Sequence, residues 1–394
     1  MRVSPIALSI LLFPQAVSAR PTIHPFSAEL LARYAPALEH AEIAVVELDP
    51  QDHAIQTTLI GYTSAPPEMV HDLVAQPENY PNFIRNLTRS TVERRADGTL
   101  INHWKISYRI ASAEGTDEIR LEPGATGAIV SLPIDKGKEG ISREEFLPAP
   151  GGGTVFVSYG CYDSIEGIPL LSSLLKRNPV WEAGLNLAGA LTVMRSVLGE
   201  ANRRAAAKGI HPAQPSGDGP AFTELLDRGT VAVVRSGTHG ELLDVSVVDR
   251  VPAPLPVILD YLRAPEKWPG QIASVKRVSI KHRDQSGLEY ELAMSGVLTD
   301  IVTTYRMSYV PNGIDTLGID GELKEMRNRW DLSPATDGST IVVWRGNLHL
   351  GANNSLLRSM FKLEPSFEHA ANVSAGLVSL RSVARHFGTI ERKR

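Results

Sequence analysis

Two long stretches of this chain repeat each other in the same order. Residues 43–101 match residues 231–289 at a constant offset of 188, and Pro77–Pro81 returns as Pro265–Pro269. Towards the end of each copy the offset is 186, where the segment 170–176 returns as 356–362. A period this long indicates a duplicated domain rather than a solenoid unit. Features shared by the copies therefore predict architecture, and features of one copy are better candidates for specificity.

The length and composition fit two ordinary globular domains. A chain of 394 residues accommodates two domains of roughly 180 residues, each able to bury its own core. Hydrophobic residues make up 43% and charged residues 21%, and the net charge of −4 does not favour binding to nucleic acid. The sequence contains no glycine-rich phosphate loop and no zinc-type spacing of Cys and His. We therefore expect no cofactor and no metal.

The first residues predict a secretory signal. Arg2 precedes a short apolar run over Ile6–Phe13, and Val17–Ala19 supplies small residues before a cut after Ala19. The alternative is a short N-terminal anchor, although the run is too short to span a bilayer comfortably. The single cysteine, Cys161, cannot form an internal disulfide, and we expect it to be buried in its strand. These features predict a secreted or periplasmic protein.

The repeat and a linker divide the chain. Residues 208–220 are rich in Gly and Pro and poor in apolar groups, which is typical of a linker. We predict a signal peptide at 1–19, a first domain at 20–207, the linker at 208–220 and a second domain at 221–394.

The sequences of the two copies predict the same order of helices and strands. A short helix and a hairpin come first, and a second helix then begins at Pro66 or Pro254, where proline suits the first helical turn. Several antiparallel strands follow, among them the alternating segment Leu288–Met294. Long helices, predicted over Pro179–Ala207 and Pro365–Phe387, close the two copies.

This order, with its motifs, resembles the START-like helix-grip superfamily. Pro77–Ile84 is similar to the signature after the first helix, and Trp330–Pro334 with Gly338–Val342 is similar to the late strand pair. Both copies resemble the polyketide cyclase, dehydrase and coenzyme Q-binding branch. The resemblance implies an α+β fold of two tandem helix-grip domains, each a curved antiparallel sheet wrapped around a long C-terminal helix. It also implies a hydrophobic ligand held between sheet and helix, but no catalytic residue, because the superfamily shares no catalytic motif.

The chain departs from that family in two respects. A secreted tandem is unusual, and Gln271 stands where the first copy has Phe83.

Strand alternation sorts the side chains to two faces. Leu288, Tyr290, Leu292 and Met294 should face inward, whereas Arg120 and its assigned counterpart Arg306 should lie on a solvated outer face in ion pairs that contribute at most about 1 kcal/mol each. In that alignment Ile119 and Leu121 correspond to Tyr305 and Met307. We expect an apolar inner face with no facing pair of carboxylates and no nucleophile–base pair. Such a face favours binding over catalysis, so no catalytic residue is assigned.

Ten residues are candidates for ligand contact. Small residues on the long helices leave room for a guest or allow close packing, and the arginines either clamp an anion at a pocket mouth or bury their stems while capping helix carbonyls. The aromatic residues are either ligand contacts or plain core, and the histidine is either a satisfied core residue or an acid–base group. The candidates are Trp104, Tyr108, Gly184, Arg195, Tyr290, Met294, Tyr305, His369, Ala370 and Arg381.

Three functions are consistent with this sequence. The first is an exported binder or carrier of a hydrophobic small molecule of the lipid or isoprenoid class, with transient membrane contact and no nucleic-acid partner. The second is a cyclase- or dehydrase-type enzyme that uses His369 or a tyrosine. The third is a structural or interaction module without a ligand. The sequence predicts neither the oligomeric state nor how the domains are arranged.

Overall fold

The computed structural model describes residues 21–107, 112–135, 140–162, 180–210, 222–237, 241–272, 274–295, 300–347, 358 and 366–391. The predicted signal peptide, most of the predicted linker and Tyr108 lie outside these residues. Within the described part, no helix is long and apolar enough to cross a membrane.

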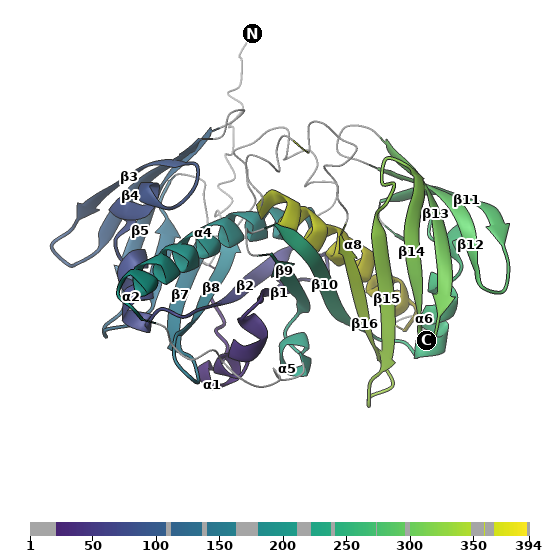
Figure 1. The fold of residues 1–394 in the computed structure, drawn as a ribbon, viewed down its shortest axis with the longest axis horizontal. Helices are drawn as coiled ribbons and strands as arrows, with labels where there is room; N and C mark the ends of the chain where they lie inside the picture. Colours follow the sequence, from purple (N-terminus) through teal and green to yellow (C-terminus); the bar gives the residue numbers. More distant parts are fainter. Residues whose placement is uncertain are drawn as a thin grey trace, which may run out of the picture.

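The first copy folds in the order predicted from its sequence (Figure 1). Its elements are α1 (Ala28–Ala32), η1 (Ala35–Leu38), β1 (Ala41–Leu48), β2 (Ala54–Thr63), α2 (Pro67–Val74), η2 (Pro77–Asn82), β3 (Leu87–Arg94), β4 (Leu100–Ser107), β5 (Ser112–Leu121), β6 (Ile129–Pro133), β7 (Gly140–Pro148), β8 (Thr154–Tyr162) and α4 (Val180–Ala207).

The second copy repeats this order. Its elements are α5 (Thr223–Leu226), β9 (Thr230–Ser236), β10 (Leu242–Val251), α6 (Leu255–Leu262), η3 (Pro265–Lys267), β11 (Val275–Arg283), β12 (Gly287–Ser295), β13 (Asp300–Val310), β14 (Gly313–Gly321), β15 (Arg327–Pro334), β16 (Thr340–Asn347) and α8 (Ser366–Glu391). The predicted helix-grip class, with an antiparallel sheet and a long C-terminal helix in each copy, is confirmed.

The sheets of the two domains join into one. The 16 strands run in the order β11-β12-β13-β14-β15-β16-β10-β9-β1-β2-β8-β7-β6-β5-β4-β3. The junction is an antiparallel ladder between β1 and β9, in which Ala44 stands opposite its own counterpart Ala232. Antiparallel pairing of equivalent strands relates the copies by an approximate two-fold axis at this pair. It also removes two exposed strand edges, which would otherwise invite pairing with other chains.

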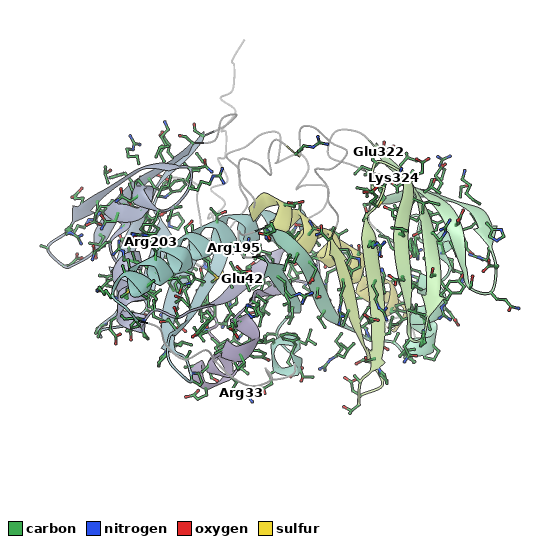
Figure 2. The ribbon with its side chains drawn as sticks, viewed as in Figure 1. Arg33, Glu42, Arg195, Arg203, Glu322 and Lys324 are labelled. Carbon is green, nitrogen blue, oxygen red and sulfur yellow. The ribbon has the colours of Figure 1, made fainter. Side chains whose placement is uncertain are left out.

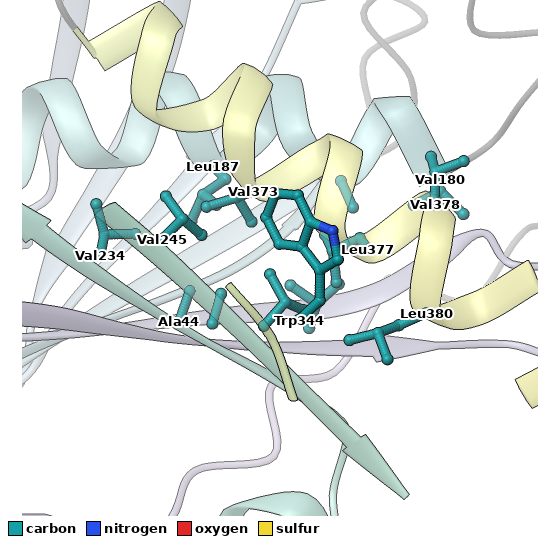
Figure 3. Close-up of a cluster of buried hydrophobic side chains, with 14 of the residues drawn as sticks. Ala44, Val180, Leu187, Val234, Val245, Trp344, Val373, Leu377, Val378 and Leu380 are labelled. Carbon is teal, nitrogen blue, oxygen red and sulfur yellow. The ribbon is translucent and has the colours of Figure 1, made fainter. Parts of the chain in front are cut away.

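The two long helices lie across one face of this sheet, which we call the inner face (Figure 1). Close approach is possible because small residues stand at the crossings. A Cβ added at Gly376 of α8 would overlap Val247 and the ring of Trp344, and one added at Gly184 of α4 would overlap Ser374 of α8. Figure 3 shows the resulting core, where helix residues such as Leu187, Val373 and Leu377 meet sheet residues of both domains.

A second, smaller core covers the opposite face, which we call the outer face, at the centre of the sheet. Helix α1, capped by the Ser27 side chain, buries Leu31, and Tyr34 follows it directly. These side chains pack on outward-facing residues of the central strands, including Ile60, Tyr159 and Val231. The middle of the sheet is therefore buried on both faces, and its ends are covered on one face only.

Candidate functional site

Polar side chains interrupt the apolar inner face of the first domain on four of its strands. Asn102 on β4, Asp117 on β5, Glu144 on β7 and Ser158 on β8 each stand two residues from a core side chain, respectively Leu100, Ile119, Phe146 and Phe156. Because side chains alternate along a strand, residues two apart share a face. The prediction of an inner face without paired carboxylates is therefore wrong for this domain.

Glu144 is the most strongly perturbed of the four. Desolvation by burial raises the pKa of its carboxyl from 4.5 to about 8, with hydrogen bonds from Ser142 and Ser158 opposing the rise and the charge of Asp117 adding to it. The Ser158 hydroxyl donates to Glu144 Oε1 at 3.5 Å. With a pKa of about 8, most of the Glu144 carboxyl is protonated at pH 7, so it donates as well as accepts hydrogen bonds.

Asn102 and Asp117 are directly opposite each other in the β4–β5 ladder. The Ser90 hydroxyl donates to Asn102 Oδ1 at 2.7 Å, which fixes the amide oxygen and directs its NH2 group elsewhere. Asp117 and its neighbours Trp104 and Ser131 are only partly buried, whereas Ile119 is in the core. The described residues thus leave this half of the inner face incompletely covered.

Two residues from the covering helices add further polar groups. Tyr80 of η2 donates its hydroxyl to Val74 O at 2.7 Å, and its pKa is raised by burial and then by Glu144 and Asp117, so it lies near both carboxyls. His71 of α2 packs edge-on against the ring of Phe146 at 5.3 Å. Both ring nitrogens of His71 are buried without a hydrogen-bond partner among the described residues, and Asp72 Oδ1 at 3.7 Å from Nδ1 is too distant. Buried polar atoms without partners are rare and point to an additional group at the site.

The second domain fills the same positions with aromatic rings. In the ladders, Asn102 and Asp117 correspond to Tyr290 and Tyr305, because the Leu100–Ile119 pair matches the Leu288–Met307 pair. Glu144 and Ser158 correspond in the same way to the paired Trp330 and Trp344. The sequence-based alignment of Ile119 with Tyr305 is therefore wrong by two residues.

These four rings are closely packed. Tyr290 and Tyr305 are each 2% exposed and stack at 5.5 Å between centroids, while Trp330 and Trp344 are 6% and 3% exposed. Trp268, the counterpart of Tyr80, packs edge-on against Tyr290 at 5.9 Å. Leu259 stands at the position of His71. The inner face of the second domain is therefore filled by aromatic side chains at these four positions, where the first domain is polar.

The candidate arginines lie in contacts between the domains. Arg195 of α4 binds Glu42 of β1 through two hydrogen bonds of 2.8 and 2.9 Å and donates to Ser236 Oγ of the second domain at 2.8 Å (Figure 2). Arg381 of α8 reaches back to Asp52 of the first domain at 3.0 Å, and Arg385 pairs with the same carboxylate. Each arginine thus contacts the β-hairpin of the other copy.

The remaining residues predicted to contact a ligand lie in different parts of the fold. Trp104 is partly buried on the inner face of the first domain, with its ring over Gly115. Gly184 lies at the contact of the two helices, and Ala370 O accepts a hydrogen bond from Ser374 Oγ there. Tyr290 and Tyr305 are core residues of the second domain, and Met294 packs at the margin of that core. His369 is fully buried with Nε2 at 3.2 Å from Ser236 Oγ. The fold therefore brings only Trp104 of the described candidates to the polar inner face.

Sequence reasoning missed Asp117, Glu144 and His71. The signal for the two carboxylates was the same alternation that placed Ile119 and Phe146 inside. For His71 the signal was its place on the apolar side of α2, next to the buried Val70. Among the described residues, no group of His, Cys, Asp and Glu is arranged to hold a metal ion.

Comparison with known proteins agrees with the fold. The family model described as polyketide cyclase / dehydrase and lipid transport matches residues 63–137, which agrees with the resemblance noted from the sequence of the first copy. The matched segment lies within the first domain and runs from the end of β2 to just before β7. No curated protein matches the chain.

Several solved structures are similar at low identity. The di-domain aromatase/cyclase StfQ of the steffimycin biosynthetic pathway is 15% identical, covers 86% of this chain and 99% of its own, and has a TM-score of 0.29. TTHA0849 from Thermus thermophilus is 19% identical over 39% of this chain and 98% of its own, with a TM-score of 0.32. A STAR-related lipid transfer protein from Xanthomonas axonopodis is 11% identical over 41% and 94%, with a TM-score of 0.33. At these low sequence identities and TM-scores, the similarity does not indicate which ligand is bound or which reaction is catalysed.

Proposed function

We propose that this protein binds one hydrophobic small molecule, of the lipid or isoprenoid class, in the inner face of its first domain. The second domain serves as a scaffold. The observation that carries this proposal is the difference between the copies at four equivalent positions. Asp117, Glu144 and Ser158 are partly exposed next to the buried Asn102, whereas tyrosine and tryptophan fill the same positions in the second domain.

The chemistry of the site fits an amphipathic guest. Trp104 is partly exposed on this face next to the buried rings of Phe146 and Phe156, and sparse polar groups stand among these apolar side chains, the mixture typical of small-molecule sites. A mostly protonated Glu144 can donate to a carbonyl or hydroxyl, and Asp117 can accept from a hydroxyl or amine. We therefore expect a ligand with an apolar body and one oxygen- or nitrogen-bearing end.

A substitution copied from the second domain tests this proposal. Ser158→Trp introduces the residue found at the equivalent Trp344 and should block the site. Displacement of a bound hydrophobic fluorescent dye by fatty acids and isoprenoid alcohols should be readily measured with wild-type protein and lost, by about ten-fold or more in affinity, in the variant. His103→Trp adds the same ring on the exposed outer face and should bind as the wild type does.

Two results would refute the proposal. One is unchanged dye and lipid binding by a Ser158→Trp variant whose circular dichroism spectrum shows that it is folded. The other is an absence of binding by the wild type to every lipid class tested.

A second candidate function is acid–base catalysis in the same site. The raised pKa of Glu144, about 8, suits a general acid or base near neutral pH, and the unpartnered ring of His71 lies against Phe146, two residues along the strand. This alternative uses Glu144 in place of His369, whose ring lies at the domain junction. If Glu144 is the catalytic acid or base, Glu144→Gln should abolish turnover and retain ligand binding. Turnover by that variant at the wild-type rate would refute this alternative.

Export to the periplasm or the exterior is part of the proposal. It rests on the apolar run Ile6–Phe13 and the small residues before Ala19. Fractionation of cells that express the full chain, with N-terminal sequencing, should find a product beginning at Arg20 outside the cytoplasm. A product that starts at Met1 and stays in the cytoplasm would refute export.

A further inference from the structure

A polar hollow lies on the outer face of the second domain. Its volume is about 460 Å³, and residues of β9, β10, β14, β15 and β16 line it. The charged lining consists of four arginines and two aspartates, namely Arg235, Arg327, Arg329, Arg345, Asp244 and Asp315. This surface is on the opposite side of the sheet from the candidate ligand site, so the two are independent.

The arginines are not fully neutralised by the protein. Arg235 pairs with Asp244, and Arg329 pairs with Asp331 at 2.7 Å and with Asp315 at 4.0 Å. The side chains of Arg327 and Arg345 are exposed, and their guanidinium groups make no ion pair or hydrogen bond within the described part of the chain.

Arg345 also stands directly opposite Arg329 in the β15–β16 ladder, an arrangement of like charges that costs stability. The hollow therefore holds excess positive charge in a protein whose net charge is −4.

The same surface of the first domain is covered by polypeptide. Tyr159 stands at the position of Arg345, since Tyr159 pairs with Arg143 as Arg345 pairs with Arg329. The Tyr159 hydroxyl accepts a hydrogen bond from Phe26 N at 3.1 Å. Gln56, the counterpart of Asp244, exchanges two hydrogen bonds with the backbone of His24, at 2.8 and 3.0 Å. In the first copy, the backbone of the segment His24–Phe26 therefore binds this outer face. In the second copy, the equivalent face carries arginines.

We propose that this hollow binds an acidic segment of a partner polypeptide, with its carboxylates on Arg327 and Arg345. Arginine matches a carboxylate with two parallel hydrogen bonds, which makes exposed, unpaired guanidinium groups suitable recognition elements. The arginines extend from β9 across β10 and β16 to β15. The two unpaired arginines, Arg327 and Arg345, are diagonal neighbours on adjacent strands, roughly 7–8 Å apart. That separation is close to the spacing of alternate side chains along an extended peptide, so each arginine can bind its own carboxylate.

Fluorescence anisotropy with a labelled peptide tests this assignment. The probe is an octapeptide of alternating Glu and Ser, titrated with the full-length protein. We expect saturable binding that weakens as salt is raised, although the net charge of the protein would repel the probe. The double variant Arg327→Ala/Arg345→Ala should weaken binding ten-fold or more, because each arginine supplies a charge-assisted hydrogen-bond pair.

Matched controls separate the hollow from general charge effects. Arg277→Ala/Arg306→Ala removes the same charge from exposed, paired arginines of the same domain and should change the affinity less than two-fold. A peptide with Gln in place of Glu should bind at least ten-fold more weakly to the wild type, a test that needs no variant.

Each of four results would overturn the proposal. They are an absence of saturable binding, equal weakening by both double variants, and displacement of the peptide by inorganic phosphate at comparable concentration. The fourth is arginine-dependent binding of phosphatidylglycerol vesicles without any binding of the peptide.

Discussion

Replacement of Glu144 by Gln should make the protein more stable at alkaline pH than the wild type. Folding raises the pKa of this carboxyl from 4.5 to about 8, mainly through desolvation. Between those two pH values the folded state binds more protons than the unfolded state, so the free energy of unfolding falls as the pH rises. The stability linked to this proton is fully present below pH 4.5 and lost as the pH passes through 8. Gln at 144 stays neutral and has no such dependence.

The size of the effect follows from the pKa values. The rise from 4.5 to about 8, at 1.36 kcal/mol per unit of pKa, sets a ceiling of roughly 5 kcal/mol. Glu144 is only partly buried by its accessible surface, so solvent reduces this penalty. We therefore expect the variant and the wild type to be nearly equal at pH 5 and to differ by about 2 kcal/mol at pH 8.

Urea unfolding at pH 5, 6, 7 and 8, followed by circular dichroism, measures this difference. Glu145→Gln on the outer face of the same strand controls for the removal of one carboxylate from β7. The difference between the pH profiles of the Glu144→Gln and Glu145→Gln variants removes the contribution of titrating groups that both variants share. Parallel profiles for wild type and Glu144→Gln would show that water solvates this carboxyl freely, and the reasoning about a desolvated carboxyl on the inner face would be wrong.

Four further substitutions test the packing. Trp344→Ala should cost about 3–5 kcal/mol in the free energy of unfolding measured with urea, because a fully packed ring leaves a cavity, whereas Ser158→Ala at the equivalent position should cost less than about 1 kcal/mol. Arg381→Ala should cost about 2 kcal/mol, less than loss of a fully buried partner, because Arg385 still pairs with the buried Asp52. Gly184→Leu should lower the thermal midpoint and cost about 1–3 kcal/mol, because its side chain would push α4 away from α8.

Each of these predictions has a contrary outcome. Trp344→Ala without loss of stability would mean that the second inner face is not closely packed. An Arg381→Ala variant as stable as the wild type would remove the role given to the contact between the domains. A stable Gly184→Leu variant would indicate that the helices do not approach each other at that residue.

The repeat and the alternation of side chains predicted the order of the elements, and the resemblance to the helix-grip superfamily predicted how they are arranged. Proline at the start of α2 and α6 and the apolar stripe of each long helix depend on local chain geometry, so they are visible in one sequence. Strands β3 and β6, with their counterparts β11 and β14, were not delimited. The segment Leu87–Arg94 shows why, since it is an edge strand with mostly exposed polar side chains and carries a weak periodic signal.

The candidate site was harder to predict because charged residues were expected on the outer face even where the alternation along a strand placed them on the inner face. Asp117 and Glu144 share a face with Ile119 and Phe146, but the inner face was expected to hold no pair of acidic residues. A sheet face only partly covered by a helix tolerates such residues, and the sequence does not reveal how far the cover extends. The contacts of Arg195 and Arg381 depend on how β1 meets β9, which no local pattern specifies.

The number of ligands bound per chain tests the central claim most directly. Native mass spectrometry of the protein, after incubation with a total lipid extract, should detect one apolar ligand per chain, and hydrogen exchange should slow in β4–β8 and not in β12–β16. Two ligands per chain, or protection confined to the second domain, would contradict the account. So would a protein that retains no ligand at all.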